Sequence, residues 1–344
     1  MGSTVTKLRN ASVTDLIGLC LVALVIFWLA VNFVKAPSEF IDIALIGLTN
    51  GMIFGLVALG YTLVYGILQL INFAHGDVFA LSGLVAWSVI VNVIGLNESS
   101  SVLVIIGGLL VTLFVIMTGF ALFNASIERV AYRPLRNAPR LAPLITAVGM
   151  SFIIQNISLA IYGVNYRSVP NFIPQTDMIH FGNVSYSWQK ASVLFIVIPL
   201  LVILSWFVRS TKQGKAMRAV AQDTEASAMM GIDVNRTISV TFLLAGSLAG
   251  AAGIVYLLQF NMRFDTGFEL GLIAFTAAVL GGIGNLTGAV LGAMMIGFIQ
   301  AFNEGLGWHA PGSDWTRSMV FGILILVLVF RPEGILGEQT PEGA

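Results

Sequence analysis

The chain contains 344 residues, of which 57% are hydrophobic and only 10% are charged, and its 17 basic residues balance its 17 acidic ones. Soluble domains carry about 25% charged residues, so this composition excludes a soluble globular protein. The neutral net charge gives no reason to expect nucleic acid as a partner. Cys20, the sole cysteine, lies in an apolar run, so neither an intramolecular disulfide nor a cysteine metal cluster is expected.

Long apolar runs along the chain predict membrane-spanning helices. The runs 16–34, 102–124, 191–208 and 238–260 contain no charged residue, and about 20 apolar residues in a helix cross the hydrocarbon core of a bilayer. The predicted fold class is therefore all-α, a polytopic membrane helix bundle. In chain order, its ten predicted transmembrane segments lie near 16–34, 41–66, 76–94, 101–124, 141–163, 191–208, 238–260, 268–283, 286–303 and 316–330.

Two regions also fit a different arrangement. The second and third segments, and the glycine-rich pair at 268–303, are compatible with broken or re-entrant helices, which membranes tolerate where the backbone is buried in protein. Such helices would change the number of spans without moving the large loops.

The first apolar run follows Lys7 and Arg9, as the apolar region of a signal peptide would. We interpret it as a retained anchor, because the run is longer than a signal peptide requires. In addition, Pro37 directly follows the nearest small-residue site at 34–36.

The distribution of Lys and Arg predicts the orientation, because cytoplasmic loops carry the excess of these residues. One side of the predicted segments holds Lys7, Arg9, Arg129, Arg133, Arg136, Arg140, Arg209, Lys212, Lys215, Arg218, Arg236 and Arg331. The other side holds Lys35, Arg167, Lys190, Arg263 and Arg317. Both termini are therefore predicted to be cytoplasmic, and 164–190 is the main external loop.

Glycine stripes indicate where helices approach each other closely, because small residues let backbones meet in lipid. Such stripes are Gly47, Gly51 and Gly55; Gly246 and Gly250; and Gly284, Gly288 and Gly292.

Charged residues lie only near the ends of the predicted segments, as Asp42, Asp77 and Glu269 do. Transporters driven by protons or ions keep ionisable groups near the middle of the membrane, where these groups bind the coupling ion. The sequence therefore disfavours a secondary transporter, and any energy for uphill transport is expected to come from another subunit.

No catalytic or metal site is predicted. The fragment 213–216 resembles a phosphate-binding loop, but Arg209 stands where the leading glycine belongs and Ala216 replaces the metal-binding hydroxyl. Histidine catalysis and metal ligation are disfavoured because the three histidines are scattered over separate segments, at His75, His180 and His309. We therefore expect that the chain is not an enzyme.

The stretch 214–231, on the predicted cytoplasmic side, is predicted to form one amphipathic helix that ends at Gly231, because glycine is suited to helix C-termini. At 100° per residue, one face carries Met217, Val220, Ala221, Thr224 and Ala228, and the opposite face carries Lys215, Arg218, Gln222 and Glu225. The helix either lies on anionic headgroups or docks into a groove on a cytoplasmic partner.

The motif Glu225-Ala226-Ser227 with Gly231 resembles the EAA loop of ABC importer permeases, the helix that engages their ATPase subunits. Ser227 replaces the second alanine of that motif. The surrounding GKAMRAVAQDTEASAMMGIDVNR is similar to the version in the branched-chain amino acid permease family. Four other segments also resemble this family: GYTLVYGILQLINFAHGDVF at 60–79, SIERVAYRPLR at 126–136, FTAAVLGGIGNLTGAVLGA at 275–293 and RPEGILG at 331–337.

This resemblance implies a permease domain over 41–337, an additional leading anchor over 1–40 and a cytoplasmic tail over 338–344. It implies a bacterial inner-membrane complex with a second, similar permease, two ATPase subunits that carry ATP and magnesium, and an external amino acid-binding protein. The chain itself is expected to bind no cofactor. The residues implied to form the ATPase-coupling helix are Gly214, Lys215, Arg218, Gln222, Glu225, Ala226 and Gly231.

The solute implied by the resemblance is a neutral, chiefly branched-chain, amino acid. Related permeases for urea or short amides share these motifs, so such solutes are an alternative. A passive channel for a small polar solute would also lack intramembrane charges, but it would have no need of a docking helix.

Polar residues within the predicted spans are candidates for the translocation path, although they can also form hydrogen bonds between helices. The candidates are Asn50, Tyr61, Tyr65, His75, Gln155, Asn156, Gln259 and Gln300. Asn72 and Asp77, near the start of the third segment, either cap a helix or line the path, and capping is the expectation we favour. Arg133 and Arg136 are expected to contact either lipid headgroups or an acidic surface of an ATPase.

Overall fold

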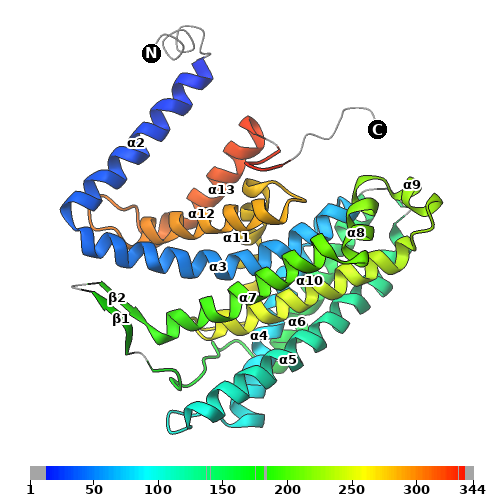
Figure 1. The fold of residues 1–344 in the computed structure, drawn as a ribbon, viewed down its shortest axis with the longest axis horizontal. Helices are drawn as coiled ribbons and strands as arrows, with labels where there is room; N and C mark the ends of the chain where they lie inside the picture. Colours follow the sequence, from blue (N-terminus) through cyan, green and yellow to red (C-terminus); the bar gives the residue numbers. More distant parts are fainter. Residues whose placement is uncertain are drawn as a thin grey trace.

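The computed structural model describes residues 13–136, 138–139, 141–174, 176–181, 184–331 and 333–337, so the predicted tail over 338–344 lies outside the described residues. The protein is a bundle of helices with one small hairpin (Figure 1). The helices are α2 (Val13–Lys35), α3 (Pro37–Leu68), α4 (Ala74–Ser88), η1 (Val89–Ile94), α5 (Val102–Ile127), η2 (Glu128–Tyr132), η3 (Arg133–Leu135), α6 (Leu141–Tyr162), α7 (Trp188–Ser210), α8 (Lys212–Gln222), α9 (Thr224–Met229), α10 (Val234–Leu257), α11 (Thr266–Gly281), α12 (Leu286–Gly305) and α13 (Ser313–Phe330).

Each of the ten predicted transmembrane segments coincides with helical structure, which confirms the all-α membrane bundle. Within the described residues, eight helices are long and apolar enough to cross a membrane. The two other segments give shorter apolar helices, Ala23–Lys35 within α2 and Thr266–Gly281, which is α11. The 16 residues of α11 rise only about 24 Å, less than the hydrocarbon thickness. The number of full spans therefore remains a prediction.

Glycines bring the central helices into close contact. A Cβ on Gly51 of α3 would lie 2.7 Å from the Cα of Met294 in α12, and one on Gly246 of α10 would lie 2.3 Å from the carbonyl oxygen of Phe120 in α5. Any larger residue at these positions would push the helices apart. The predicted stripes containing Gly51 and Gly246 therefore do act as helix contacts, as is usual in membranes.

The start of α4 lies beside the middle of α3. A Cβ on Gly60 would lie 2.1 Å from Nε2 of His75, and α3 continues beyond Gly60 to Leu68. The chain between the two helices must therefore fold back along α3 before α4 begins. The first turn of α4 also meets α11, because a Cβ on Gly76 would lie 2.3 Å from the carbonyl oxygen of Gly267. Both observations place the start of α4 inside the bundle, against α3 and α11. The choice between two simple spans and a broken or re-entrant arrangement stays a prediction, because α3 and the helix over Ala74–Ile94 are each long and apolar enough to cross a membrane.

The predicted external loop contains an unexpected hairpin. Strands β1 (Asp177–Phe181) and β2 (Val184–Ser187) pair antiparallel, with Phe181 opposite Val184 and an irregularity between Asp177 and Ile179. The Tyr186 hydroxyl and Thr49 of α3 form a 2.9 Å hydrogen bond, and burial raises the pKa of Tyr186 above its ordinary value. The hairpin is thereby attached to the bundle.

The hairpin and the α8–α9 segment lie at opposite ends of the molecule, and α2 extends away from the bundle (Figure 1). The end of α2 is attached to the α12–α13 connection: Trp28 Nε1 donates to the carbonyl of Trp308 at 2.9 Å, and the backbone N–H of Trp308 donates to Asn32 Oδ1 at 3.1 Å. Residues 1–40, predicted as an extra anchor, thus include a described helix that contacts the bundle through its last turns.

Candidate functional site

Helix α8 is fixed against the end of α7. Thr211 caps α8 by accepting a 3.0 Å hydrogen bond from the N–H of Gly214. A Cβ on Gly214 would lie 2.2 Å from the carbonyl oxygen of Val208, so only glycine fits between the two helices. Arg218 donates to that same carbonyl of Val208, which would otherwise be an unsatisfied acceptor at a helix C-terminus. Gly214 and Arg218, both predicted coupling residues, thus hold the base of the segment in place.

The prediction of one continuous helix over 214–231 is wrong. Helix α8 ends at Gln222, Asp223 adopts an extended backbone with φ −153° and ψ 109°, and α9 begins at Thr224. The Asp223 carboxylate accepts a 2.8 Å hydrogen bond from the N–H of Ala226. Aspartate side chains compete with the helix for backbone N–H groups and so favour N-cap positions, which explains the break.

The break also changes which side chains are buried. Met217 and Val220 of α8 pack into the bundle, 3% and 2% exposed, as the amphipathic pattern predicts. Thr224 and Ala228, which were predicted on the same face, are exposed instead, and Ser227 is buried in their place. Because α9 starts in a new direction after Asp223, the periodicity of α8 does not continue into it.

Gly231 ends the segment, as predicted. Its φ is +83°, a left-handed conformation that glycine adopts without the steric cost of a Cβ. The N–H of Gly231 donates to the carbonyl of Ala228 at 3.0 Å, and the N–H of Ile232 donates to that of Ser227 at 3.0 Å. This pair of hydrogen bonds is the Schellman motif of helix C-termini, and it turns the chain from α9 into α10.

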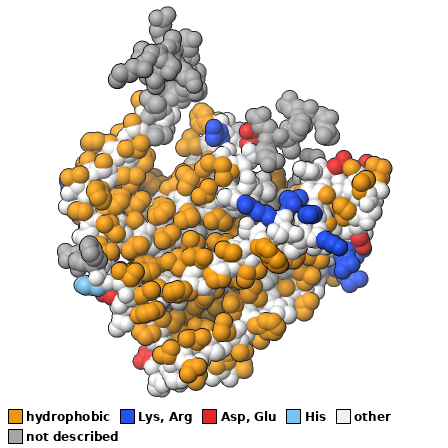
Figure 2. All heavy atoms as spheres, in the orientation of Figure 1, with side chains coloured by type: hydrophobic (Ala, Val, Ile, Leu, Met, Phe, Trp, Pro, Cys, Tyr) orange, Lys and Arg blue, Asp and Glu red, His pale blue; other side chains and the backbone are white. Residues whose placement is uncertain are grey.

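The tip of the segment is an exposed apolar surface. Met229 and Met230 are 83% and 84% exposed, and the predicted coupling residues Lys215, Gln222 and Glu225 are also exposed. Lys and Arg side chains gather at this end of the molecule, whereas hydrophobic side chains cover most of the bundle (Figure 2). A surface with basic residues and two uncovered methionines is suited to contact with another protein, since methionine adapts to varied partners.

Two of the path candidates meet in the centre of the bundle. The rings of Tyr61 and His75 pack edge to face with centroids 4.9 Å apart, and both residues are buried. Asn50, earlier on α3, is also buried, 7% exposed, and Tyr65 is half-buried near the end of the same helix. These four residues lie on α3 and the first turn of α4.

A fifth candidate, Gln155, is joined to this region by a chain of hydrogen bonds. Ser151 of α6 donates to Asp77 Oδ2 at 2.5 Å, and Gln155 Nε2 donates to Ser151 Oγ at 3.4 Å. The expectation that Asn72 and Asp77 cap α4 is wrong, because the N-cap is Phe73 and no side chain caps this helix. Asn72 instead accepts a 2.7 Å hydrogen bond from the Tyr132 hydroxyl. Asp77 thus links α4 to α6, and Asn72 links the α3–α4 connection to η2.

Two further candidates lie apart from this centre. Asn156 is exposed on α6 and donates to the carbonyl of Phe152 in its own helix at 2.8 Å. Gln300 of α12 donates to Glu304 at 3.1 Å, one turn along the same helix. Both side chains therefore bond within their own helices, and their role in a path remains a prediction.

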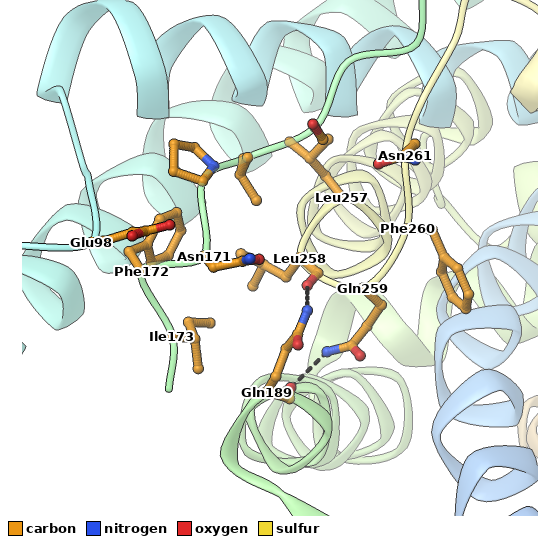
Figure 3. A pocket seen from close by; sticks show the side chains of 13 residues that line it. Glu98, Asn171, Phe172, Ile173, Gln189, Leu257, Leu258, Gln259, Phe260 and Asn261 are labelled. Carbon is orange, nitrogen blue, oxygen red and sulfur yellow. Dashed lines mark hydrogen bonds between the residues drawn. The ribbon is translucent and has the colours of Figure 1, made fainter. Parts of the chain in front are cut away.

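Gln259 does not lie within a span, because α10 ends at Leu257. It borders a cavity of about 350 Å³ at the end of the bundle where α7 begins, lined by Glu98, 168–173, Gln189 and 257–261 (Figure 3). Gln259 Nε2 donates to the carbonyl of Gln189 at 2.6 Å, and Gln189 Nε2 donates to that of Leu258 at 2.7 Å. These bonds hold the ends of α7 and α10 together beside the cavity.

Sequence reasoning missed a buried carboxylate. Glu128, at the start of η2, is 0% exposed and accepts hydrogen bonds from Arg136 and from Ser239 of α10. Arg136, expected at headgroups or at a partner, is instead turned into the protein. Glu128 and Arg136 lie close together in the sequence motif at 126–136. Their spacing alone does not indicate that the Glu128 carboxylate is buried.

Residues 43–329 match the model of a protein family described as branched-chain amino acid transport system / permease component. The chain belongs to this family. The resemblance predicted from the motifs is therefore confirmed, and the chain is an ABC transporter permease. As a transport component, it is consistent with the expectation that it is not an enzyme.

Two relatives of this permease align over most of its length. The high-affinity branched-chain amino acid transport system permease protein BraD of Pseudomonas aeruginosa is 38% identical over 302 residues, 86% of this chain and 95% of that protein. The protein LivH of Escherichia coli, described in the same words, is 35% identical over 301 residues, 86% and 95% of the two chains. Among solved structures, PsaBC from Streptococcus pneumoniae in complex with Fab is 12% identical with a TM-score of 0.44, covering 88% of this chain and 97% of that one.

Proposed function

We propose that this permease is a transmembrane subunit of a binding-protein-dependent importer for neutral, chiefly branched-chain, amino acids in a bacterial cytoplasmic membrane. The proposal is supported by relatives that are named as high-affinity branched-chain amino acid permeases and align over 86% of the chain. Its partners are a second permease, two ATPase subunits and an external amino acid-binding protein. ATP and Mg²⁺ are bound by the ATPases.

The observation that carries the proposal is the construction of the α8–α9 segment. Its base is fixed to α7 through Gly214 and Arg218, while its tip exposes Met229 and Met230. A fixed base transmits force to the bundle, and exposed apolar side chains gain free energy when a partner buries them. We infer that an ATPase subunit binds this tip. A passive channel has no need of such a segment.

The charges support a cytoplasmic position for this segment. Exposed Arg209, Lys212 and Lys215 lie at its base, and Lys/Arg-rich ends face the cytoplasm in membrane proteins. The hairpin and the cavity beside Gln259 then face the exterior, where a binding protein would deliver the solute. This orientation provides ATPases with access to α9.

The proposed function can be tested by purifying the affinity-tagged permease from its native membrane. We expect two ATPase polypeptides and a second permease to co-purify, and the complex in liposomes to accumulate leucine only with internal ATP and the external binding protein. The isolated chain should neither hydrolyse ATP nor accumulate leucine under a proton or sodium gradient. Gradient-driven accumulation, or ATP-independent equilibration of leucine through the isolated chain, would contradict the proposal.

A further inference from the structure

Glu128 is a fully buried carboxylate with a partner for each oxygen. Its side chain is 0% exposed, Arg136 Nη2 donates to Oε1, and the hydroxyl of Ser239 donates to Oε2 at 2.7 Å. A carboxylate of this kind must remain paired, because burying an unpaired charge is strongly unfavourable. The pairing therefore fixes the position of Arg136 relative to the end of α5.

Arg136 also binds the start of α10. Its Nη1 donates to Asn235 Oδ1 at 2.6 Å, so one guanidinium joins two elements. Guanidinium carries several donors in a rigid plane, which lysine cannot reproduce. Asn235 belongs to the first turn of α10, which Asp233 caps by accepting a 3.0 Å hydrogen bond from the N–H of Arg236.

This first turn directly follows the α8–α9 segment. The Schellman turn of α9 ends at Ile232, and Asp233 caps α10 immediately afterwards. A displacement of α9 therefore acts first on the turn that holds Asn235. From there α10 runs into the bundle, where the carbonyl of Ala249 accepts a 3.0 Å hydrogen bond from Ser82 of α4.

The other end of the contact is a π-helix. Residues Glu128–Tyr132 form η2 at the end of α5, and π-helical turns are rare and are found frequently at functional sites. Tyr132, the last residue of η2, donates to Asn72 in the connection between α3 and α4 at 2.7 Å. A shift of η2 would thus reach the region where Tyr61 and His75 meet.

We propose that Arg136 is a positioning residue that transmits movement of the α8–α9 segment to α5 and α10, and so keeps ATP hydrolysis coupled to solute passage. The inference rests on the proposed function, because it requires an ATPase that moves α9. Its structural basis is the bridge from Glu128 through Arg136 to Asn235. It assigns a role to the motif at 126–136 that is separate from contact with lipid or with the ATPase surface.

The test uses the assembled complex in nanodiscs and liposomes and measures uptake per ATP hydrolysed. Asn235→Ala removes only the contact to α10, and Arg136→Lys keeps the charge beside Glu128 but loses the bridge. For both we expect an assembled complex, stimulated ATP hydrolysis within about twofold of the wild type, and uptake per ATP lowered about tenfold, the effect of losing one hydrogen bond to a charged group. Arg129→Gln, an exposed change in the same motif, should leave the ratio unchanged.

A purely structural contact would give a different result. Uptake and hydrolysis would then fall together through lost assembly, and uptake per ATP would stay at the wild-type value, which would overturn the proposal. The variant Arg136→Gln leaves the Glu128 carboxylate buried without a positive partner, so this variant is expected to assemble poorly. The double variant Glu128→Gln/Arg136→Gln removes that unpaired charge. It should assemble but remain uncoupled. A coupled double variant would also overturn the proposal. If the wild-type complex itself showed no stimulated hydrolysis, the proposed function and not the bridge would be at fault.

Discussion

The imidazole of His75 packs directly against the backbone of Gly60, where a Cβ would lie 2.1 Å from Nε2. We expect Gly60→Ala to destabilise the permease by about 1–3 kcal/mol, the usual effect of overpacking a well-filled core. Thermal unfolding in detergent measures this change. The double variant Gly60→Ala/His75→Ala should recover most of the loss, and Gly119→Ala, with nothing within 4 Å of the added carbon, serves as the control. An unaffected Gly60→Ala variant would contradict the contact.

The N-cap of α9 gives a second prediction. Asp223→Ala removes the acceptor for the N–H of Ala226 and should destabilise α9 by about 1 kcal/mol, whereas Asp223→Asn keeps an acceptor and should behave as the wild type. Hydrogen exchange of the amides in Thr224–Met229 measures the effect. Equal protection in Ala and Asn variants would show that Asp223 does not fix the break.

The long apolar helices were predictable from composition alone, because a long run of apolar residues is stable in lipid but not when exposed to water. The runs at 102–124 and 191–208 give α5 and α7 with ends displaced by a few residues, since about 20 apolar residues are sufficient to define a span. The bounds of α11 were predicted to within two residues, but its 16 residues are fewer than the roughly 20 that define a span.

The site was only partly predictable, because its details depend on tertiary contacts. Gly231 was identifiable, since its role depends on local backbone conformation. The break at Asp223 was not, because aspartate is compatible with both an exposed helix position and an N-cap. The burial of Glu128 depends on Arg136, on Ser239 and on the folding of η2. Helical periodicity in the sequence cannot predict such a contact, because Ser239 is distant from Glu128 in the chain.

Topology is testable with single cysteines in a Cys20→Ser background. Lys215→Cys should react only with membrane-permeant thiol reagents, because we propose that the basic end of the bundle faces the cytoplasm. Asn171→Cys, beside the cavity in Figure 3, should react with impermeant reagents in intact cells. Both side chains are exposed, so accessibility to water does not distinguish them. Labelling of Lys215→Cys by an impermeant reagent in intact cells would show that the proposed orientation is reversed.

The turn after α9 gives a prediction about coupling. Gly231→Val places a β-branched residue at a φ of +83°, which such residues tolerate poorly, and Glu225→Lys reverses an exposed charge on α9. Both variants should reach the membrane but lose leucine uptake, which immunoblotting and transport assays in cells measure. Gly231→Asn, which adopts left-handed conformations more readily, should retain more uptake than Gly231→Val. Wild-type uptake in both Gly231→Val and Glu225→Lys would contradict a role for this turn in transport.

We propose that an ATPase subunit buries the tip of α9, and co-purification with the variant Met229→Asn/Met230→Asn tests this contact. These side chains are 83% and 84% exposed, so the folded permease should be unaffected, with an unchanged melting temperature. Val93→Asn is the control, at a residue that is 77% exposed and lies in η1, which packs against α4 and α5. We expect the double variant to lose most of its bound ATPase and its stimulated ATP hydrolysis, and the control to keep both. Wild-type co-purification and hydrolysis in the double variant would contradict the proposed contact.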